Sequence, residues 1–268
     1  MASGATSDSP VMDEPVAGGT VALINGEGAS AILLVCEHAS HQIPAAFGTL
    51  GLPDDLLASH IAWDPGALAV AARLSAAFDA PLVAQRVSRL IYDCNRPPEA
   101  PDAIPAVSEI YPVPGNEGLD EAARGLRVER YYRPFRAKLS ATIEARIAAG
   151  KPPVVVTVHS FTPVFKGEHR AVEIGVLHDS DARLADRLLA RTGEAPYDIR
   201  RNEPYGPEDG VTHTLVDQAV SRGLVNVMLE IRNDLIADEA GQARVADFLA
   251  RWIGEAVETV QPSGARNA

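Results

Sequence analysis

Short apolar runs alternate with helical patterns along most of this chain. Three of the runs are rich in Val, Ile and Leu, and β-branched side chains favour strands. They cover residues 31–36, 154–158 and 224–229. Each run is almost uninterrupted, as is typical of strands that are buried on both faces of a sheet. We therefore predict three central strands, widely spaced along the chain.

The remaining patterns predict further strands and the helices that cover the sheet. Apolar residues at helical spacing predict helices, and short apolar or alternating runs predict strands. The expected helices cover residues 66–78, 120–149, 181–191, 215–222 and 241–257, and the expected strands 81–85, 88–92 and 172–178. Because strands and helices alternate, we predict an α/β fold with helices on both faces of the sheet.

Two stretches are read as loops. Residues 97–116 are rich in Pro, Glu and Gly, and loops of that length are usually functional or mobile. Residues 202–210 are rich in turn-forming residues and form either a loop over a site or a simple connection. The polar residues 1–20 predict a disordered leader and residues 261–268 a disordered tail. We expect one domain over residues 21–260.

Composition narrows the class of protein. With 268 residues and 46% hydrophobic content, the chain can bury a substantial core. Its net charge of −12 argues against binding to nucleic acid or to an anionic membrane. No apolar run approaches the ~20 residues that cross a bilayer, and no secretory signal is evident. The two cysteines, Cys36 and Cys94, suggest a reducing compartment. We expect a cytoplasmic monomer or homodimer.

Each of the three central strands ends in a side chain that can carry chemistry. His38 follows the first, His159 ends the second and Glu230 ends the third. Open α/β sheets bind ligands at the carboxyl ends of their strands. If these ends converge on one rim, the three side chains would form a metal-assisted hydrolytic site.

Several residues are candidate metal ligands. A catalytic zinc usually has three protein ligands from His, Asp or Glu and one open position. His38 and His159 are placed by strand ends, and His41 stands three residues after His38. Asp64 precedes the helix at 66–78, so it is either a ligand or the N-cap of that helix. A single His at a strand end is otherwise a hydrogen-bonded core residue.

Glu230 also has two interpretations. A carboxylate within an apolar strand is costly unless it is paired or its pKa rises. Arg232 lies two residues on, on the same side of the strand, and would form a buried ion pair. Alternatively, Glu230 is a general base that takes a proton from water and returns it to a leaving amine.

Arginines are the candidates for binding a carboxylate, because their planar guanidinium groups bind it in bidentate fashion. Arg86, Arg89 and Arg96 cluster near Asn95, and Asp93 and Glu99 are alternative acidic partners for them. Arg170 and Arg232 are further candidates. The chain has no P-loop, no GxGxxG sequence opening a helix and no GxSxG elbow, so neither nucleotide binding nor a serine nucleophile is supported.

Five ordered motifs together resemble the N-formylglutamate amidohydrolase family, over roughly residues 30–250. The motifs are Cys36-Glu37-His38-Ala39-Ser40 with Ile43-Pro44, His60-Ile61-Ala62-Trp63-Asp64-Pro65-Gly66-Ala67, Ser88-Arg89-Leu90-Ile91-Tyr92-Asp93-Cys94-Asn95-Arg96-Pro97, His159-Ser160-Phe161-Thr162-Pro163 and Glu230-Ile231-Arg232-Asn233-Asp234. The family looks like a distant relative of the zinc carboxypeptidases and aspartoacylase-type deacylases. The resemblance implies a three-layer α/β/α fold with a mixed, mostly parallel sheet.

The resemblance also implies roles for individual residues. In those relatives a His, a Glu three residues later and a later His bind zinc, an Asn-Arg pair holds the substrate carboxylate, and a late Glu is the base. Carried over, His38 and His159 bind Zn²⁺ and Glu230 is the base. The third ligand departs from the pattern, because His41 stands where the relatives have Glu. We favour Asp64 as that ligand. The candidate substrate-binding residues are Arg89, Asn95, Arg96, Ser160, Arg170 and Arg232.

We therefore expect a zinc-dependent amidohydrolase acting on an N-acyl amino acid such as N-formylglutamate, a small substrate that bears a carboxylate. Two alternatives remain at this point. One is a protein that binds a carboxylate ligand on the same fold without hydrolysing it. The other is a hydrolase of a larger peptide-like substrate, with room set by the 97–116 loop.

Overall fold

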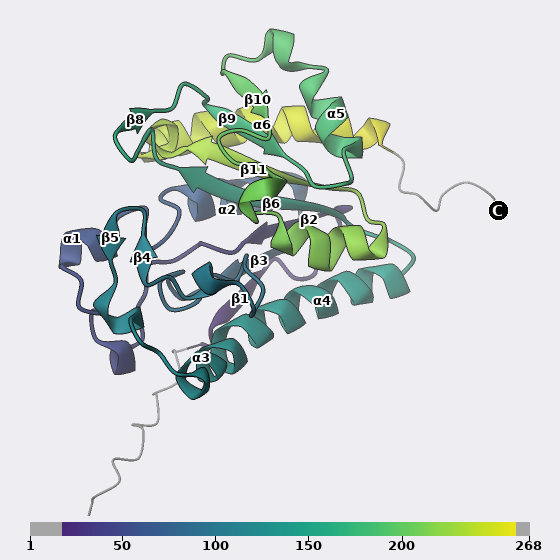
Figure 1. The fold of residues 1–268 in the computed structure, drawn as a ribbon. Helices are drawn as coiled ribbons and strands as arrows, with labels where there is room; N and C mark the ends of the chain where they lie inside the picture. Colours follow the sequence, from purple (N-terminus) through teal and green to yellow (C-terminus); the bar gives the residue numbers. More distant parts are fainter. Residues whose placement is uncertain (1–17, 261–268) are drawn as a thin grey trace, which may run out of the picture.

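The computed structural model describes residues 18–260, and its main element is a mixed sheet of seven strands. Their order across the sheet is β1-β3-β2-β6-β11-β9-β10 (Figure 1). The strands are β1 (Val21–Ile24), β2 (Ile32–Cys36), β3 (Leu82–Gln85), β6 (Val154–Phe161), β9 (Ile174–Leu177), β10 (Ile199–Arg201) and β11 (Asn226–Arg232). The predicted tail and residues 1–17 of the predicted leader lie outside the described residues.

The sheet is mostly parallel. Strands β3, β2, β6 and β11 run parallel to one another, and β9 and β10 form a second parallel pair. Strand β1 is antiparallel to β3, and β9 is antiparallel to β11. The predicted α/β/α class with a mixed, mostly parallel sheet is therefore confirmed.

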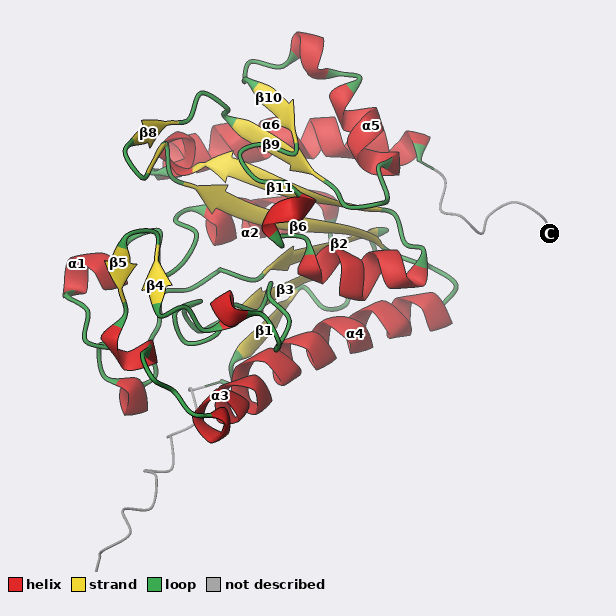
Figure 2. Ribbon diagram, viewed as in Figure 1, coloured by secondary structure: helices red, strands yellow, loops and turns green. Residues whose placement is uncertain are grey.

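Helices cover both faces of the sheet (Figure 2). The α-helices of the described residues are α1 (Asp54–Leu57), α2 (Ala67–Phe78), α3 (Glu121–Arg127), α4 (Arg133–Ala148), α5 (Arg183–Leu189) and α6 (Glu239–Thr259). Helices α2, α5 and α6 pack on one face and share its apolar core. Helix α4 lies across the other face with a separate core. None of the helices in the part of the chain described is both long and apolar enough to cross a membrane.

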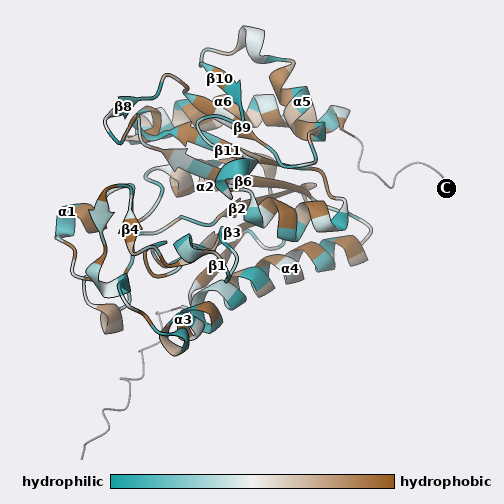
Figure 3. Ribbon diagram, in the orientation of Figure 1, coloured by the Kyte–Doolittle hydropathy of each residue, from teal (hydrophilic) through white to brown (hydrophobic). Residues whose placement is uncertain are grey.

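Alternate residues of the central strands belong to opposite cores, which explains why their apolar runs are continuous. In β6, Val154, Val156 and Val158 face α2 and α6, whereas Val155 faces α4. All eight residues of β6 are buried. Figure 3 shows the resulting hydrophobic colour of β2 and β6 at the centre of the sheet. The period of two also places His159 on the α4 face of the sheet.

Smaller elements build two hairpins near one end of the sheet. Strands β4 (Val107–Ser108) and β5 (Tyr111–Pro112) pair within the predicted 97–116 loop. Strands β7 (Val164–Phe165) and β8 (Glu168–His169) pair after β6. The predicted 120–149 helix is α3 and α4, joined by a π-helical segment at Val128–Tyr132. The predicted helix at 215–222 is a π-helical segment followed by a 3-10 turn.

One predicted strand is wrong. Residues 88–92 form a turn instead of a strand. The Ser88 hydroxyl accepts a hydrogen bond from the Leu90 amide at 3.1 Å and donates to the Ala62 carbonyl at 2.8 Å. Such local bonds offer the backbone an alternative to a strand ladder. The turn brings the side chains of Arg89 and Asp93 to His38 and Asp64, whereas Leu90, Ile91 and Cys94 pack in the core.

Candidate active site

The sheet brings the three predicted strand-end side chains together. Strands β2, β6 and β11 are neighbours, and Glu230 is paired with His159 across β11 and β6. Paired residues on adjacent strands project from the same face of a sheet. His38 follows β2 by two residues, at the same rim. The strand order therefore brings the three distant segments to one edge of the sheet, as predicted.

Asp64 reaches the rim from the loop before α2. Its backbone amide donates to the His38 carbonyl at 2.9 Å, and its Oδ2 accepts from the Ser160 amide at 3.2 Å. The N-cap position of α2 belongs to Gly66, so the side chain of Asp64 does not cap the helix. Gly66 has a φ of 81°, and a Cβ there would overlap the Ile236 carbonyl oxygen. Glycine therefore permits the turn that aims Asp64 at the two histidines.

His38, Asp64 and His159 form a compact buried group of potential ligands. One ligand atom from each lies within 4.8 Å of the others. Nδ1 of His159 is 2.9 Å from Oδ2 of Asp64 and 3.2 Å from Nδ1 of His38. Each of the three residues is at most 3% exposed. Two imidazoles and a carboxylate that converge in this way match the donors of a catalytic zinc site.

His41 lies apart from this group. Its side chain is exposed, and its ring packs at 4.8 Å from the Trp63 ring. Of the two residues considered for the third ligand, the geometry therefore brings Asp64, and not His41, to the two histidines.

Two further carboxylates hold the far side of each imidazole. Oδ1 of Asp93 is 2.6 Å from Nε2 of His38, and Oε2 of Glu37 is 3.0 Å from Nε2 of His159. Carboxylates in this position fix the orientation of metal-binding histidines and raise their basicity. Sequence reasoning did not include Glu37 and Asp93 among the site residues. The sequence could have pointed to them, because both lie within the family motifs: Glu37 directly precedes His38, and Asp93 directly follows Tyr92.

The charges in this group support one another. Burial opposes ionisation, but the nearby His38 outweighs it and holds the pKa of Asp64 well below its ordinary range. Burial would likewise lower the pKa of His159, but Glu37 and Asp64 reverse the effect and raise it well above its usual value. The buried carboxylates therefore favour a positive charge between them, whether a proton or a cation supplies it.

Glu230 lies in the same pocket without a salt-bridge partner among the described residues. It is 6% exposed, its Oε2 has no hydrogen-bond partner, and burial raises its pKa to about 7. The alternative of an ion pair with Arg232 does not hold. Arg232 instead binds Asp234 at 2.8 Å and Glu173 at 3.4 Å.

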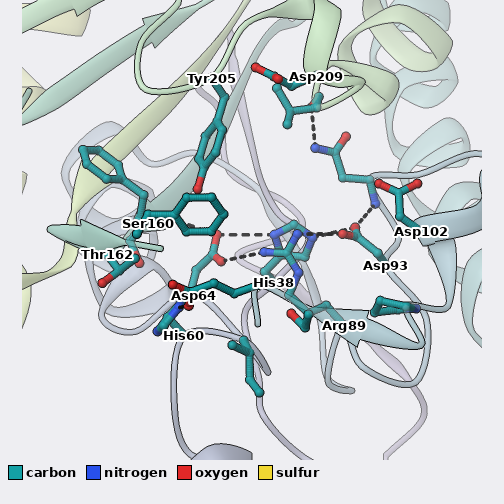
Figure 4. A pocket seen from close by; sticks show the side chains of 18 of the residues that line it. His38, His60, Asp64, Arg89, Asp93, Asp102, Ser160, Thr162, Tyr205 and Asp209 are labelled. Atoms are coloured by element: carbon teal, nitrogen blue, oxygen red, sulfur yellow. Dashed lines mark hydrogen bonds and ion pairs between the residues drawn. The ribbon is translucent and has the colours of Figure 1, made fainter. Parts of the chain in front are cut away.

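Part of this group faces a cavity of about 490 Å³ (Figure 4). His38, Asp64 and Glu230 contribute to its wall, and residues of both hairpins, including Glu109 and Phe165, close its sides. A cavity of this volume is in the range of pockets that hold small organic ligands.

Arg89 and Arg96 line this cavity, with different partners. The Arg89 guanidinium contacts Asp64 at 3.3 Å and Asp93 at 2.7 Å. Arg96 donates to Asp102 at 2.7 Å and to the Gly210 carbonyl at 2.9 Å.

The other predicted substrate-binding residues are more constrained. Asn95 lines the cavity, but its side chain donates to the Val211 carbonyl and accepts from the Thr214 amide. Ser160 lines it as well, and its hydroxyl donates to the Pro65 carbonyl at 2.9 Å. Arg170 and Arg232 are absent from the cavity lining among the described residues.

The turn-rich segment 202–210 lies over the site. Tyr205 and Asp209 belong to the cavity lining. Gly175 makes room for this segment, because a Cβ on it would collide with the Glu203 carbonyl oxygen. Gly175 is also the residue of β9 that pairs with Glu230 of β11. The segment therefore passes directly above the sheet beside Glu230.

Comparison with known proteins agrees with the geometry. A family model described as N-formylglutamate amidohydrolase matches residues 30–237. The structure of a gene product from Agrobacterium tumefaciens is 58% identical, with a TM-score of 0.89 over 90% of this chain and 96% of that one. An N-formylglutamate amidohydrolase from Ralstonia eutropha is 19% identical and shares the fold, with a TM-score of 0.70 over 90% of this chain and 98% of that one. A search of curated proteins gives no match. The chain therefore belongs to the N-formylglutamate amidohydrolase family, whose members are hydrolases of amide bonds.

Proposed function

We propose that this protein is a zinc-dependent amidohydrolase that cleaves the amide bond of an N-acyl amino acid such as N-formylglutamate. The observation that carries the proposal is the presence of two kinds of group in one cavity. The buried His38–Asp64–His159 group supplies potential metal ligands, and Glu230 supplies a carboxylate without a partner among the described residues.

The donor set fits a divalent metal such as zinc. Two imidazole nitrogens and one carboxylate oxygen leave a further position for water or substrate. Glu37 and Asp93 would orient the two imidazoles. When bound, the metal polarises the amide carbonyl and lowers the pKa of water.

Glu230 would act as the general base. It lies on the same sheet face as His159 and has a free carboxylate oxygen. It would take a proton from the attacking water and then transfer it to the amine nitrogen as the C–N bond breaks. A base with a pKa near the working pH is effective in both directions.

Arg89 and Arg96 would hold the carboxylate of the substrate, since both are cationic and line the cavity. Holding that end of the molecule places the amide next to the ligand group. Asn95 and Ser160 would shape the wall through their bonds to Val211 and Pro65. We assign Arg232 to the support of the strand end.

The decisive test combines turnover with metal analysis. Wild-type protein is loaded with zinc and assayed against N-formyl, N-acetyl and N-succinyl amino acids. Glu230→Gln should lower kcat by a factor on the order of 10² to 10⁴ while keeping the metal content of the wild type. Glu258→Gln on the exposed side of α6 is the matched control. Full activity of Glu230→Gln would overturn the assigned mechanism, and ligand binding without turnover by the wild type would favour a binding protein.

A second candidate is a hydrolase of a larger N-acyl or peptide-like substrate. The cavity volume of about 490 Å³ favours it, because pockets of that size hold molecules with substantial side groups. A preference in the panel for long acyl groups or for dipeptides over N-formylglutamate would support this candidate.

A further inference from the structure

We propose that Tyr205 is a catalytic residue whose hydroxyl donates a hydrogen bond to the carbonyl oxygen of the amide being cleaved, and that Arg170 is the positioning residue that orients this hydroxyl. The inference rests on the proposed amidohydrolase function and adds to it the group that stabilises the developing negative charge.

Tyr205 is placed for this role by the segment that crosses the site. It lines the same cavity as Asp64 and Glu230. Figure 4 shows its ring entering the pocket from the side opposite Arg89, with the hydroxyl directed towards Asp64. A hydroxyl in this position faces the place where a substrate amide would lie between the ligand group and the base.

The hydrogen bond that Tyr205 forms uses its oxygen and leaves its hydroxyl proton free. Nη1 of Arg170 lies 2.9 Å from the Tyr205 oxygen. A guanidinium group has donors only, so the phenol oxygen must be the acceptor in this bond. Within residues 18–260, the phenol forms no hydrogen bond in which it is the donor. The proton is therefore available to a ligand in the cavity.

Arg170 is built to hold the phenol rather than to bind the substrate directly. Its guanidinium carbon lies 4.4 Å from the Phe165 ring centre, 4.7 Å from that of Tyr205 and 5.6 Å from that of Phe161. No carboxylate of the described chain forms an ion pair with it, and it is not part of the cavity lining. Cation–π contacts with three rings fix the guanidinium plane and hence the direction of its bond to Tyr205.

The protonation state also suits a donor. Burial raises the pKa of Tyr205, and the nearby Glu230 raises it further, against the opposing effect of Arg170. The phenol is therefore neutral at neutral pH and keeps the proton that it offers.

The chemical step balances without any further reactant. A water oxygen forms a bond to the carbonyl carbon while Glu230 takes its proton, and the π electrons of the carbonyl move to its oxygen. The Tyr205 O–H donates to that oxygen and keeps its proton throughout. When the carbonyl re-forms, the C–N bond breaks and the proton on Glu230 goes to nitrogen, giving an acid and an amine. A donor that binds the oxygen more strongly as it gains charge lowers the barrier.

The test uses Tyr205→Phe, which removes the hydroxyl but keeps the ring that packs on Arg170. With N-formylglutamate or the best substrate of the panel, kcat should fall by roughly 10²- to 10³-fold, as for loss of one oxyanion donor. KM and metal content should change little, because the bond forms mainly in the transition state. Tyr197→Phe, on the far face beside Phe248, is the control and should match the wild type.

Arg170→Met and the double variant test the positioning role. Arg170→Met should lower kcat, whereas adding it to Tyr205→Phe should cause little further loss, because both changes remove the same oriented donor. A purely structural role for Arg170 would give additive losses and reduced thermal stability in both backgrounds.

Calorimetry with a phosphonamidate analogue of the substrate adds a measurement that needs no turnover. Tyr205→Phe should bind this tetrahedral analogue much more weakly than the wild type, but bind the product amino acid equally well. An active wild type with an equally active Tyr205→Phe variant would refute the role of Tyr205 alone. A wild type that hydrolyses no member of the panel would refute the proposed function, and this inference with it.

Discussion

The carboxylate of Glu37 lies 3.0 Å from Nε2 of His159, and both side chains are almost inaccessible to solvent. Burial raises the pKa of Glu37, but His159 outweighs that effect and the net shift is downward. The carboxylate is therefore ionised and pairs with the imidazole, whose Nδ1 is directed at Asp64. Strand β6 sets the position of the His159 ring, and Glu37 sets its orientation.

Glu37→Gln should consequently weaken metal binding. The amide keeps the size of the side chain but removes the charge that makes His159 more basic. Loss of such an outer partner typically costs 10–100-fold in metal affinity, to be measured by competition with a chromophoric chelator. Glu168→Gln on the exposed β8 is the control. Unchanged affinity in Glu37→Gln would show that His159 is oriented by other contacts.

Asp64→Ala should lower the metal content of the protein, whereas His41→Ala should leave it unchanged. Asp64 lies with His38 and His159, whereas His41 is exposed beside Trp63. Elemental analysis after dialysis should therefore find the metal lost from Asp64→Ala and retained in His41→Ala. The reverse result would make His41 the third ligand and would require the loop after His38 to rearrange.

Leu34→Ala should destabilise the fold. Leu34 is fully buried in β2, whose carboxyl end leads to His38. Truncating a buried leucine leaves a cavity and lowers the free energy of unfolding by about 2–5 kcal/mol. Chemical denaturation measures the change, and Leu126→Ala, at an exposed position of α3, should cost less than about 0.5 kcal/mol. Similar losses in the two variants would contradict the assigned core.

Asp79→Asn should remove a pH-dependent part of the stability. The bonds from Asn25 and the Ala29 amide hold the pKa of Asp79 below its ordinary value. A carboxyl group with a lowered folded-state pKa stabilises the fold above its unfolded pKa of about 3.9 and loses that contribution as the pH falls through its folded-state pKa. The variant should thus be less stable than the wild type at pH 7, with the difference shrinking in acid. Denaturation at a series of pH values measures the difference, and Asp247→Asn, exposed on α6, is the control variant.

Much of the fold followed from local patterns. The central strands were predictable because burial on both faces of the sheet leaves a continuous apolar run. Helices α2, α4 and α6 were predictable because burial of one helix face leaves apolar residues at helical spacing. Strand β1 was missed because it is an edge strand of only four residues, although all four are apolar, and β10 was missed because its three residues include two arginines. The predicted strand at 88–92 was wrong because the Ser88 hydroxyl forms hydrogen bonds with backbone groups that favour a turn.

The site was predictable where strand ends carried chemistry and unpredictable where loops did. His38, His159 and Glu230 were predictable because each stands at the end of an apolar run, within two residues of the end of its strand. The partners of Asn95 and the position of Tyr205 depend on how residues 202–214 fold back, which no local pattern encodes. Asp93 was read as a partner of the arginines, and it does bind Arg89, but its contact with His38 requires knowledge of the turn at 88–92.

The missing side chain at Gly175 has a consequence for how this protein tolerates variation. A single added methyl group there would push the Glu203 backbone outward and carry the phenol of the next-but-one residue away from Glu230. A replacement in the middle of a strand, with no charge gained or lost, would thereby move Tyr205 and Glu230 apart on the two sides of the cavity. Natural drift at this position is expected to be as restricted as drift at the histidines themselves.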